Sequence, residues 1–181
     1  FDPVPDEPSQ DAADRARLSL ESLGFNEASV PISFIDGHPA TGHHAAMSHD
    51  GLTITSLAET WDGAGTVAAG TEFEKLPFAA LNTAFASNGL SLRVTKETRV
   101  SRPIHVVFLT SDRTSLAPQP RIAIDLAPDS QLQLVLHFAG ADDGSAWTNL
   151  VSHISQGARS RLTLYRLQEL PPAGLHTELL T

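Results

Sequence analysis

Cysteine is absent from this chain of 181 residues, and aromatic residues make up only 6% of it. Without thiolates, the chain cannot by itself form a disulfide framework, a zinc finger or a thiolate-held iron–sulfur cluster. No apolar run approaches the ~20 residues that a membrane-spanning helix requires. We therefore expect neither a disulfide-stabilised fold nor a membrane partner.

Basic residues are also few, with 12 Lys plus Arg against 21 Asp plus Glu and a formal net charge of −9. Because affinity for nucleic acids depends on Lys and Arg that neutralise phosphates, we expect no nucleic-acid partner. Hydrophobic residues make up 41%, which is enough for a core, and charged residues 18%, which is ordinary for a β-rich protein. The length suits one domain, with or without a small appendage.

Two helix signals occur before residue 89. Residues 9–24 predict a helix with a serine cap at its start and a glycine stop at its end. Pro77 suits the first position of a second helix, which Asn88-Gly89 ends. The apolar residues of this second helix recur on one face: Phe78, Leu81, Ala84 and Phe85.

Short strands accompany these helices. Strands are predicted at residues 30–36 and 52–57, with an irregular, small-residue-rich segment at 38–50 between them. We therefore expect a small α/β region over residues 1–88.

After residue 89 the helix signals end, and apolar residues alternate with polar ones in the period-2 pattern of strands. Six runs show this alternation: 90–94, 104–108, 122–126, 132–136, 150–154 and 162–167. Polar corners lie between paired runs at 96–102, 127–130 and 156–161.

The runs recur at nearly constant intervals. Ile104 maps onto Leu132 at a shift of 28, and Leu132 maps onto Leu162 at a shift of 30. The other runs give the same shifts, with Val94 to Ile122 at 28 and Ile124 to Ile154 at 30. A repeated β unit of about thirty residues without a crossover helix predicts a solenoid with parallel ladders of stacked strands.

We therefore predict a mainly β fold, in which residues 1–88 form the α/β region and 89–181 form coils of about 28–30 residues. A β-sandwich built of hairpins is the alternative, because it also places strands at regular intervals. The two architectures differ in that the sandwich predicts antiparallel hairpins and the solenoid predicts parallel stacking.

Glycine-rich motifs do not predict a nucleotide site. The stretch at 63–68 fits a loose dinucleotide fingerprint, but it does not join a strand to a helix. Gly65 and Gly70 have phosphate-loop spacing, yet Thr71 and Glu72 stand where lysine and a hydroxyl residue are needed. No G-x-S-x-G elbow is present to anchor a hydrolase triad.

Histidines fall into two groups. His38, His43, His44 and His49 lie within twelve residues of an irregular segment, where solvated side chains are the simpler interpretation than a metal site. Three others lie in predicted strands and are expected to point outward, with a role in proton or metal handling as the alternative: His105, His137 and His153.

Acidic residues of the predicted coils lie mostly at corners or in loops: Asp112, Asp125, Asp129, Asp142 and Asp143. A glycoside-cleaving site would need carboxylates clustered on one ladder. We interpret these residues as solvated corner acids.

A series of short segments runs in order through residues 30–181, including Ser33-Phe-Ile-Asp-Gly37, Phe78 to Gly89 and Arg102-Pro-Ile-His-Val-Val-Phe108. Further members follow or intervene at 50–57, 120–124, 134–138, Asn149 and 164–168. The series resembles the "FVDG" turn, the "LNxAF…G" stretch and the "KPIHLLF" run of the SufD proteins. These belong to the SufB/SufD family of the SUF iron–sulfur cluster assembly system.

The resemblance implies a right-handed parallel β-helix and a cytoplasmic, non-catalytic scaffold subunit rather than an enzyme. The implied partners are a SufB-like paralogue and a SufC-like ATPase, bound through regions expected to lie outside this chain, and a second copy of the full-length protein. The complex handles the iron–sulfur cluster, and this chain is expected to bind no cofactor.

The resemblance implies that the family's partner-binding parts and its proposed cluster-binding histidine lie beyond this chain, so no catalytic, cofactor-binding or metal residue is carried over. His137 and His176 match no cluster-binding motif. The lack of cysteine favours SufD over SufB.

Two other functions stay open from the residues alone. A carbohydrate-active β-helix enzyme would need an acidic cleft with aromatic platforms, and a β-sandwich binding module would need hairpin pairing. The chain begins at Phe1 and stops at Leu179-Leu180-Thr181, where an apolar alternation is starting. We therefore expect it to be part of a longer protein.

Overall fold

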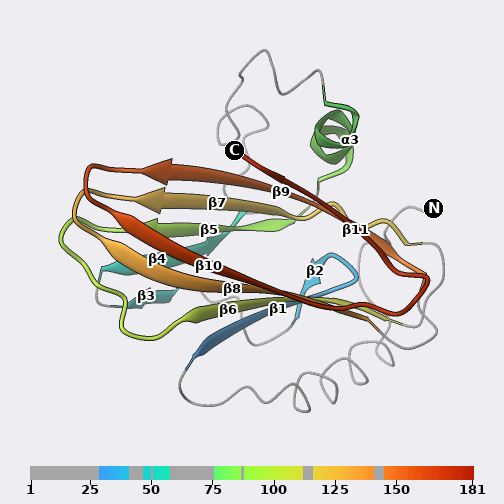
Figure 1. The fold of residues 1–181 in the computed structure, drawn as a ribbon, viewed down its shortest axis with the longest axis horizontal. Helices are drawn as coiled ribbons and strands as arrows, with labels where there is room; N and C mark the ends of the chain where they lie inside the picture. Colours follow the sequence, from blue (N-terminus) through green and yellow to red (C-terminus); the bar gives the residue numbers. More distant parts are fainter. Residues whose placement is uncertain are drawn as a thin grey trace.

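The computed structural model describes residues 29–40, 47–49, 51–57, 76–86, 88–111, 116–140 and 145–181. Within these ranges the protein is mainly β, with two mostly parallel sheets and one short helix (Figure 1). The predicted helix at 9–24 lies outside the described residues.

The first sheet has five strands in the order β10-β8-β6-β1-β2. Their bounds are β1 (Val30–Ile35), β2 (His38–Pro39), β6 (Ile104–Thr110), β8 (Gln131–Gly140) and β10 (Arg161–Glu169). The neighbours β1, β6, β8 and β10 pair in parallel, and only the short β2 is antiparallel to its neighbour.

The second sheet has six strands in the order β11-β9-β7-β5-β4-β3. Their bounds are β3 (Met47–His49), β4 (Leu52–Ser56), β5 (Gly89–Val94), β7 (Arg121–Leu126), β9 (Trp147–Gln156) and β11 (Leu175–Leu180). Strands β5, β7, β9 and β11 pair in parallel, whereas β3, β4 and β5 pair antiparallel. Antiparallel pairs are therefore confined, in the described part of the chain, to the start of each sheet.

Every predicted strand is confirmed, because alternation of apolar and polar residues places one face of each strand in the core. The prediction that 38–50 is irregular is wrong at two points, since β2 and β3 lie there. The apolar alternation noted at the end of the chain belongs to a strand that was not predicted. This strand, β11, begins at Leu175 and ends at Leu180.

The predicted coil-to-coil shifts are only partly correct. Leu132 pairs with Leu162 and Ile124 with Ile154, so both shifts of 30 are confirmed. Both shifts of 28 are wrong, because Ile104 pairs with Leu134, a shift of 30, and Val94 with Leu126, a shift of 32. Side chains alternate with a period of two, so a register error of two residues leaves the hydrophobic pattern unchanged.

The core lies between the two sheets and is continuous from β1 to β9. Phe34 on β1, Phe108 on β6 and Phe138 on β8 form a stacked column, with successive ring centroids 5.3 Å apart. All three rings are at most 4% exposed. The three phenylalanines occupy paired positions of β1, β6 and β8, so their stacking matches the register of these neighbouring strands.

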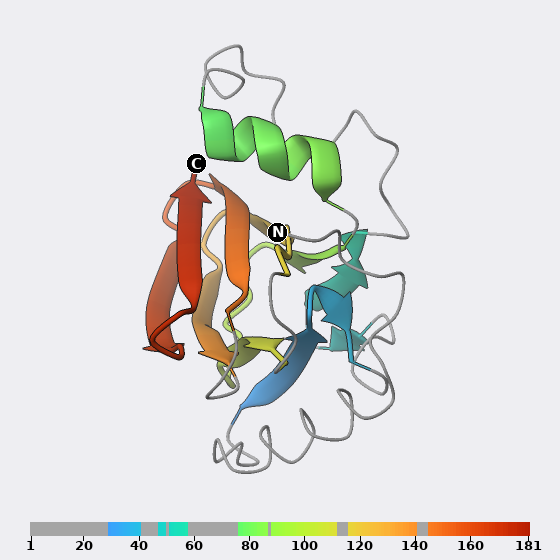
Figure 2. The same ribbon diagram turned by 90° about the vertical axis from the view of Figure 1, so that its right-hand side faces the viewer.

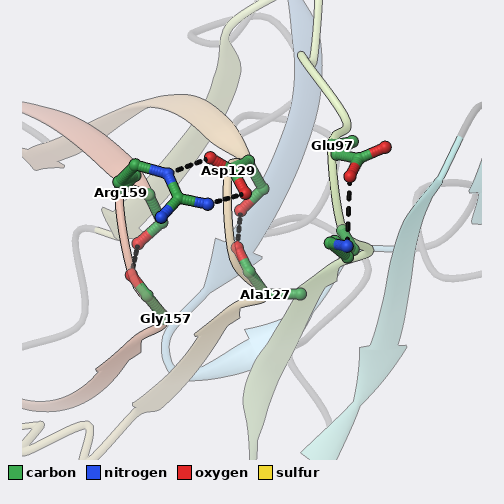
Figure 3. A network of polar contacts seen from close by, with 8 residues as sticks. Glu97, Ala127, Asp129, Gly157 and Arg159 are labelled. Carbon is green, nitrogen blue, oxygen red and sulfur yellow. Dashed lines mark hydrogen bonds and ion pairs between the residues drawn. The ribbon is translucent and has the colours of Figure 1, made fainter.

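The corners between the ladders share one backbone conformation. Glu97, Asp129 and Arg159 have positive φ angles of 60°, 61° and 57°. Backbone hydrogen bonds link one corner to the next, from Glu97 N to Pro128 O (3.1 Å) and from Asp129 N to Ala158 O (3.0 Å). Arg159 donates to both carboxylate oxygens of Asp129 at 2.6 Å (Figure 3).

The single described helix, α3 (Pro77–Phe85), confirms the prediction from Pro77. It lies outside the strands, next to the six-stranded sheet, as Figures 1 and 2 show. Its buried residues are Ala79 and Asn82, whereas Phe78 and Phe85 are 53% and 65% exposed. The predicted apolar face is therefore largely exposed, although the Phe78 ring packs edge-on against Trp147 of β9, with ring centroids 5.4 Å apart.

Candidate functional site

Helix α3 is attached to the six-stranded sheet by a buried polar network, which we call the α3 network and which centres on Asn82, Arg121 and Asn149. The Asn82 amide donates to the backbone carbonyls of Pro120 (3.1 Å) and Asn149 (2.8 Å). These carbonyls belong to neighbouring parallel strands, because Pro120 directly precedes β7, Asn149 lies in β9, and β7 pairs with β9. One side chain of α3 therefore bonds to two adjacent strands of the sheet.

Arg121 completes the helix side of the network. The buried guanidinium donates from Nε to Asn82 Oδ1 at 2.5 Å and from Nη2 to Thr83 Oγ1 at 2.6 Å. Burial lowers the pKa of Arg121, but a guanidinium stays protonated in proteins. Arg121 thus contributes a desolvated positive charge that holds α3 in place.

Asn149 completes the sheet side of the network. Its amide donates to the carbonyl of Phe78 (2.8 Å) and to Gln119 Oε1 (2.6 Å). Its Oδ1 accepts from Thr177 Oγ1 at 2.8 Å, which extends the network to β11. The arrangement holds α3 against the sheet through β7, β9 and β11.

A second polar group, the imidazole row, crosses the outer face of the five-stranded sheet. His105 Nε2 lies 3.3 Å from His137 Nδ1, and His137 Nε2 lies 2.8 Å from Glu169 Oε2. The three residues come from β6, β8 and β10, so the row crosses three adjacent strands. Burial, and after it the charge of His137, lower the pKa of His105.

A third polar group, the inward cluster, joins β10 to β11, and in it the Arg166 side chain is 38% exposed and the Glu178 side chain 12% exposed. Arg166 donates to Glu178 through two bonds of 2.6 and 3.0 Å. The His176 ring lies 3.9 Å from the Phe138 ring, and neither of its nitrogens has a hydrogen-bond partner among the described residues. Burial pulls the pKa of Glu178 upward, but the neighbouring His176 and Arg166 outweigh it and leave the pKa below its usual value.

The histidines predicted as a loop cluster are not brought together in the described residues. His38 is buried, its Nδ1 lies 3.5 Å from Asn88 Nδ2, and its Nε2 has no partner in the described part. His43 and His44 lie outside the described residues, and only the backbone of His49 is described. His153 is outward-facing, as predicted, and its Nδ1 lies 3.1 Å from Thr181 Oγ1.

Two of the predicted corner acids are described. Asp125 lies instead on strand β7, where it is exposed and forms an ion pair with Arg93 at 3.4 Å. Asp129 lies at a corner, is half-buried, and forms an ion pair with Arg159. The hydrogen bonds from Arg159 lower the pKa of Asp129. Three acids and the glycine-rich motifs lie outside the described residues: Asp112, Asp142, Asp143, residues 63–68, Gly70, Thr71 and Glu72.

The sequence did not predict that the residues of the α3 network, the imidazole row or the inward cluster would contact one another. Among the described residues no three His, Asp or Glu side chains gather closely enough to hold a metal ion. No described helix has both the length and the apolar character needed to cross a bilayer.

No protein-family model and no curated protein sequence matches the chain. The SufD resemblance therefore remains a prediction that depends on the residues quoted above.

Proposed function

We propose that this chain belongs to a cytoplasmic scaffold subunit of the SUF iron–sulfur assembly system, similar to SufD. In this proposal it acts with a SufB-like paralogue and a SufC-like ATPase, catalyses no reaction, and leaves the cluster to the whole complex. The fold that goes with the proposal is a right-handed parallel β-helix.

The observation that carries the proposal is the position of Asn82. This residue is the asparagine of the segment that resembles "LNxAF…G", and its amide binds the carbonyls of Pro120 and Asn149. Asparagine has a low helix propensity, so its presence inside a helix needs an explanation. The buried hydrogen bonds of Asn82 explain why the motif has asparagine at this position. Asn149 and the segment at 120–124, which also belong to the resemblance, form the other side of this contact.

The turn that resembles "FVDG" has a comparable physical role. Asp36 follows β1 with φ of 50°, and Gly37 with φ of 85°. The Asp36 carboxylate accepts from the backbone N (2.8 Å) and the Oγ (2.7 Å) of Ser111, just after β6. A short acid followed by glycine suits both the positive φ angles and this contact.

The β-helix part of the proposal is supported by the parallel ladders. Shifts of 28, 30 and 32 residues separate paired strands from Gly89 onward, as in β9–β11, β6–β8 and β5–β7. The stacked corners at Glu97, Asp129 and Arg159 repeat at the same intervals.

Affinity purification from the natural host tests the proposed function. The tagged gene product that carries this sequence is purified from iron-limited cells, and copurifying proteins are identified by mass spectrometry. We expect a SufC-like ATPase and a SufB-like paralogue above the level retained by an unrelated protein with the same tag. Absence of both, when the ATPase is detected in the lysate, contradicts the SUF assignment.

A further inference from the structure

Basic residues gather at the corners that join the two sheets, although the whole chain has a formal net charge of −9. The corner segments 95–102, 127–131 and 157–161 contain five basic side chains and only two acidic ones. The basic residues are Lys96, Arg99, Arg102, Arg159 and Arg161, and the acidic ones are Glu97 and Asp129. The described corners therefore carry a surplus of positive charge.

Both corner acids already have a basic partner. Lys96 Nζ lies 3.1 Å from Glu97 Oε1, and Arg159 donates to both carboxylate oxygens of Asp129 (Figure 3). The positive charge of Lys96 also contributes to the lowered pKa of Asp129. The carboxylates of these corners are thus engaged by Lys96 and Arg159, and neither forms an ion pair with Arg99 or Arg161.

Arg99 and Arg161 stand on either side of Gln131, and we call these three residues the arginine row. Arg99 forms a parallel bridge with Gln131, and Gln131 pairs with Arg161. Backbone hydrogen bonds of 2.8 Å hold the three segments together, from Gln131 N to Thr98 O and from Arg161 N to Ser130 O. Since neighbouring strands lie about 4.8 Å apart, the two arginines start roughly 10 Å from each other.

The arginine row faces away from the core. Each of its members is followed by an apolar residue of the core or packed against it: Val100, Leu132 and Leu162. Because successive side chains of a strand point to opposite faces, the row points outward. Arg99 and Arg161 are exposed and Gln131 is half-buried, so both guanidinium groups are accessible.

We propose that the arginine row is a docking site for an acidic polypeptide segment, whose carboxylates bind Arg99 and Arg161. A guanidinium binds a carboxylate through two parallel hydrogen bonds, as Arg159 does with Asp129 at the neighbouring corner. The amide of Gln131 lies between the two and can donate to a backbone carbonyl of the same segment. This inference does not depend on the proposed scaffold function.

The size and surroundings of the arginine row favour a short acidic segment over a nucleic acid or an anionic membrane. At physiological ionic strength charges are screened over about 8 Å, so the attraction is confined to the corners. A segment with two carboxylates roughly 10 Å apart contacts both arginines. A longer polyanion would extend beyond them over a chain with a net charge of −9 and would find few further Lys or Arg.

Fluorescence anisotropy with a labelled oligoglutamate peptide tests the site in the protein of 181 residues. We expect saturable binding that weakens as salt is added, because exposed ion pairs are screened. The double variant Arg99→Gln/Arg161→Gln should weaken binding by about tenfold, as expected for the loss of two exposed ion pairs.

Arg93→Gln is the matched control, because it removes one exposed arginine that is already paired with Asp125 on the other sheet. It should change the dissociation constant by less than about twofold. All three substituted side chains are exposed, and thermal unfolding checks that the variants fold. Labelled oligothymidylate and phosphatidylserine vesicles, added in place of the peptide, should bind more weakly than oligoglutamate.

The proposal is overturned if oligoglutamate shows no saturable binding, or if the double variant binds it as tightly as the unaltered protein. It is also overturned if Arg93→Gln weakens binding as much as the double variant, since net charge alone would then explain the affinity. Tighter binding of oligothymidylate or of the vesicles would assign the row to phosphate groups instead of carboxylates.

Discussion

Asn82 of α3 donates a hydrogen bond of 2.8 Å to the backbone carbonyl of Asn149, which lies 67 positions later in the chain. The bond joins α3, the only helix among the described residues, to β9, which is the fifth strand after it in the chain. A fully buried amide that also bonds to Pro120 and Arg121 leaves several polar groups unsatisfied if it is removed.

Asn82→Ala should therefore lower the free energy of unfolding by about 3 kcal/mol, since unsatisfied buried groups cost roughly 1–3 kcal/mol each. Chemical denaturation measures the change. The matched control is Ala84→Ser on the exposed face of α3, which should change stability by less than about 0.5 kcal/mol. Equal effects of the two substitutions would mean that α3 is not held by this network.

The turn after β1 allows a second test, in which shape is kept and charge is removed. Asp36→Asn preserves volume and tolerates the φ of 50°, but it exchanges one acceptor oxygen for a donor that faces Ser111. We expect a loss of about 1–2 kcal/mol, because bonds to a charged group are stronger than neutral ones. Ser111→Ala, which removes only the hydroxyl bond, should cost less, and the reverse order would contradict the assigned contacts.

The positive φ of Glu97 predicts a stabilising substitution. Glycine adopts this region without the steric penalty that other residues have, so Glu97→Gly should raise the free energy of unfolding by about 0.5–1 kcal/mol. Glu97→Val, with a β-branched side chain at the same φ of 60°, should lower it. Thermal unfolding of both variants gives the comparison, and a stabilising valine would show that the corner is not left-handed.

Acid should weaken the inward cluster. Because the pKa of Glu178 is lower in the fold than in the unfolded chain, the unfolded chain binds protons first as pH falls. The stabilisation is fully present above the unfolded value, near pH 4.5, and is lost as pH decreases through the folded pKa. Glu178→Gln should flatten the fall in stability between about pH 5 and pH 3, and an unchanged slope in this variant would contradict the role given to Glu178.

The strands could be predicted from the sequence because each buries alternate residues, but their register could not. A shift of 28 would place His105 opposite Gln133, four residues from His137. The observed shift of 30 places it opposite Val135, two residues from His137, and brings the rings into contact. The imidazole row was therefore invisible to a pattern that cannot distinguish one even shift from another.

The contact face of α3 could not be predicted for a different reason. Apolar periodicity favours Phe78 and Phe85, yet the sheet receives Ala79 and Asn82. Only hydrogen bonds to residues 38 and 67 positions away give Asn82 its burial, and no local pattern encodes them. The inward cluster is similar, since Arg166 occupies the inward phase of β10 and is matched only by Glu178 on another strand.

The even spacing of the ladders also limits how the gene can change. The shifts between paired strands differ by two residues, 30 between β6 and β8 and 32 between β5 and β7, and inward side chains stay inward. Insertion of six nucleotides at a corner preserves this phase. Insertion of three would turn the following strand inside out, so viable length variants at these corners should gain or lose codons in pairs.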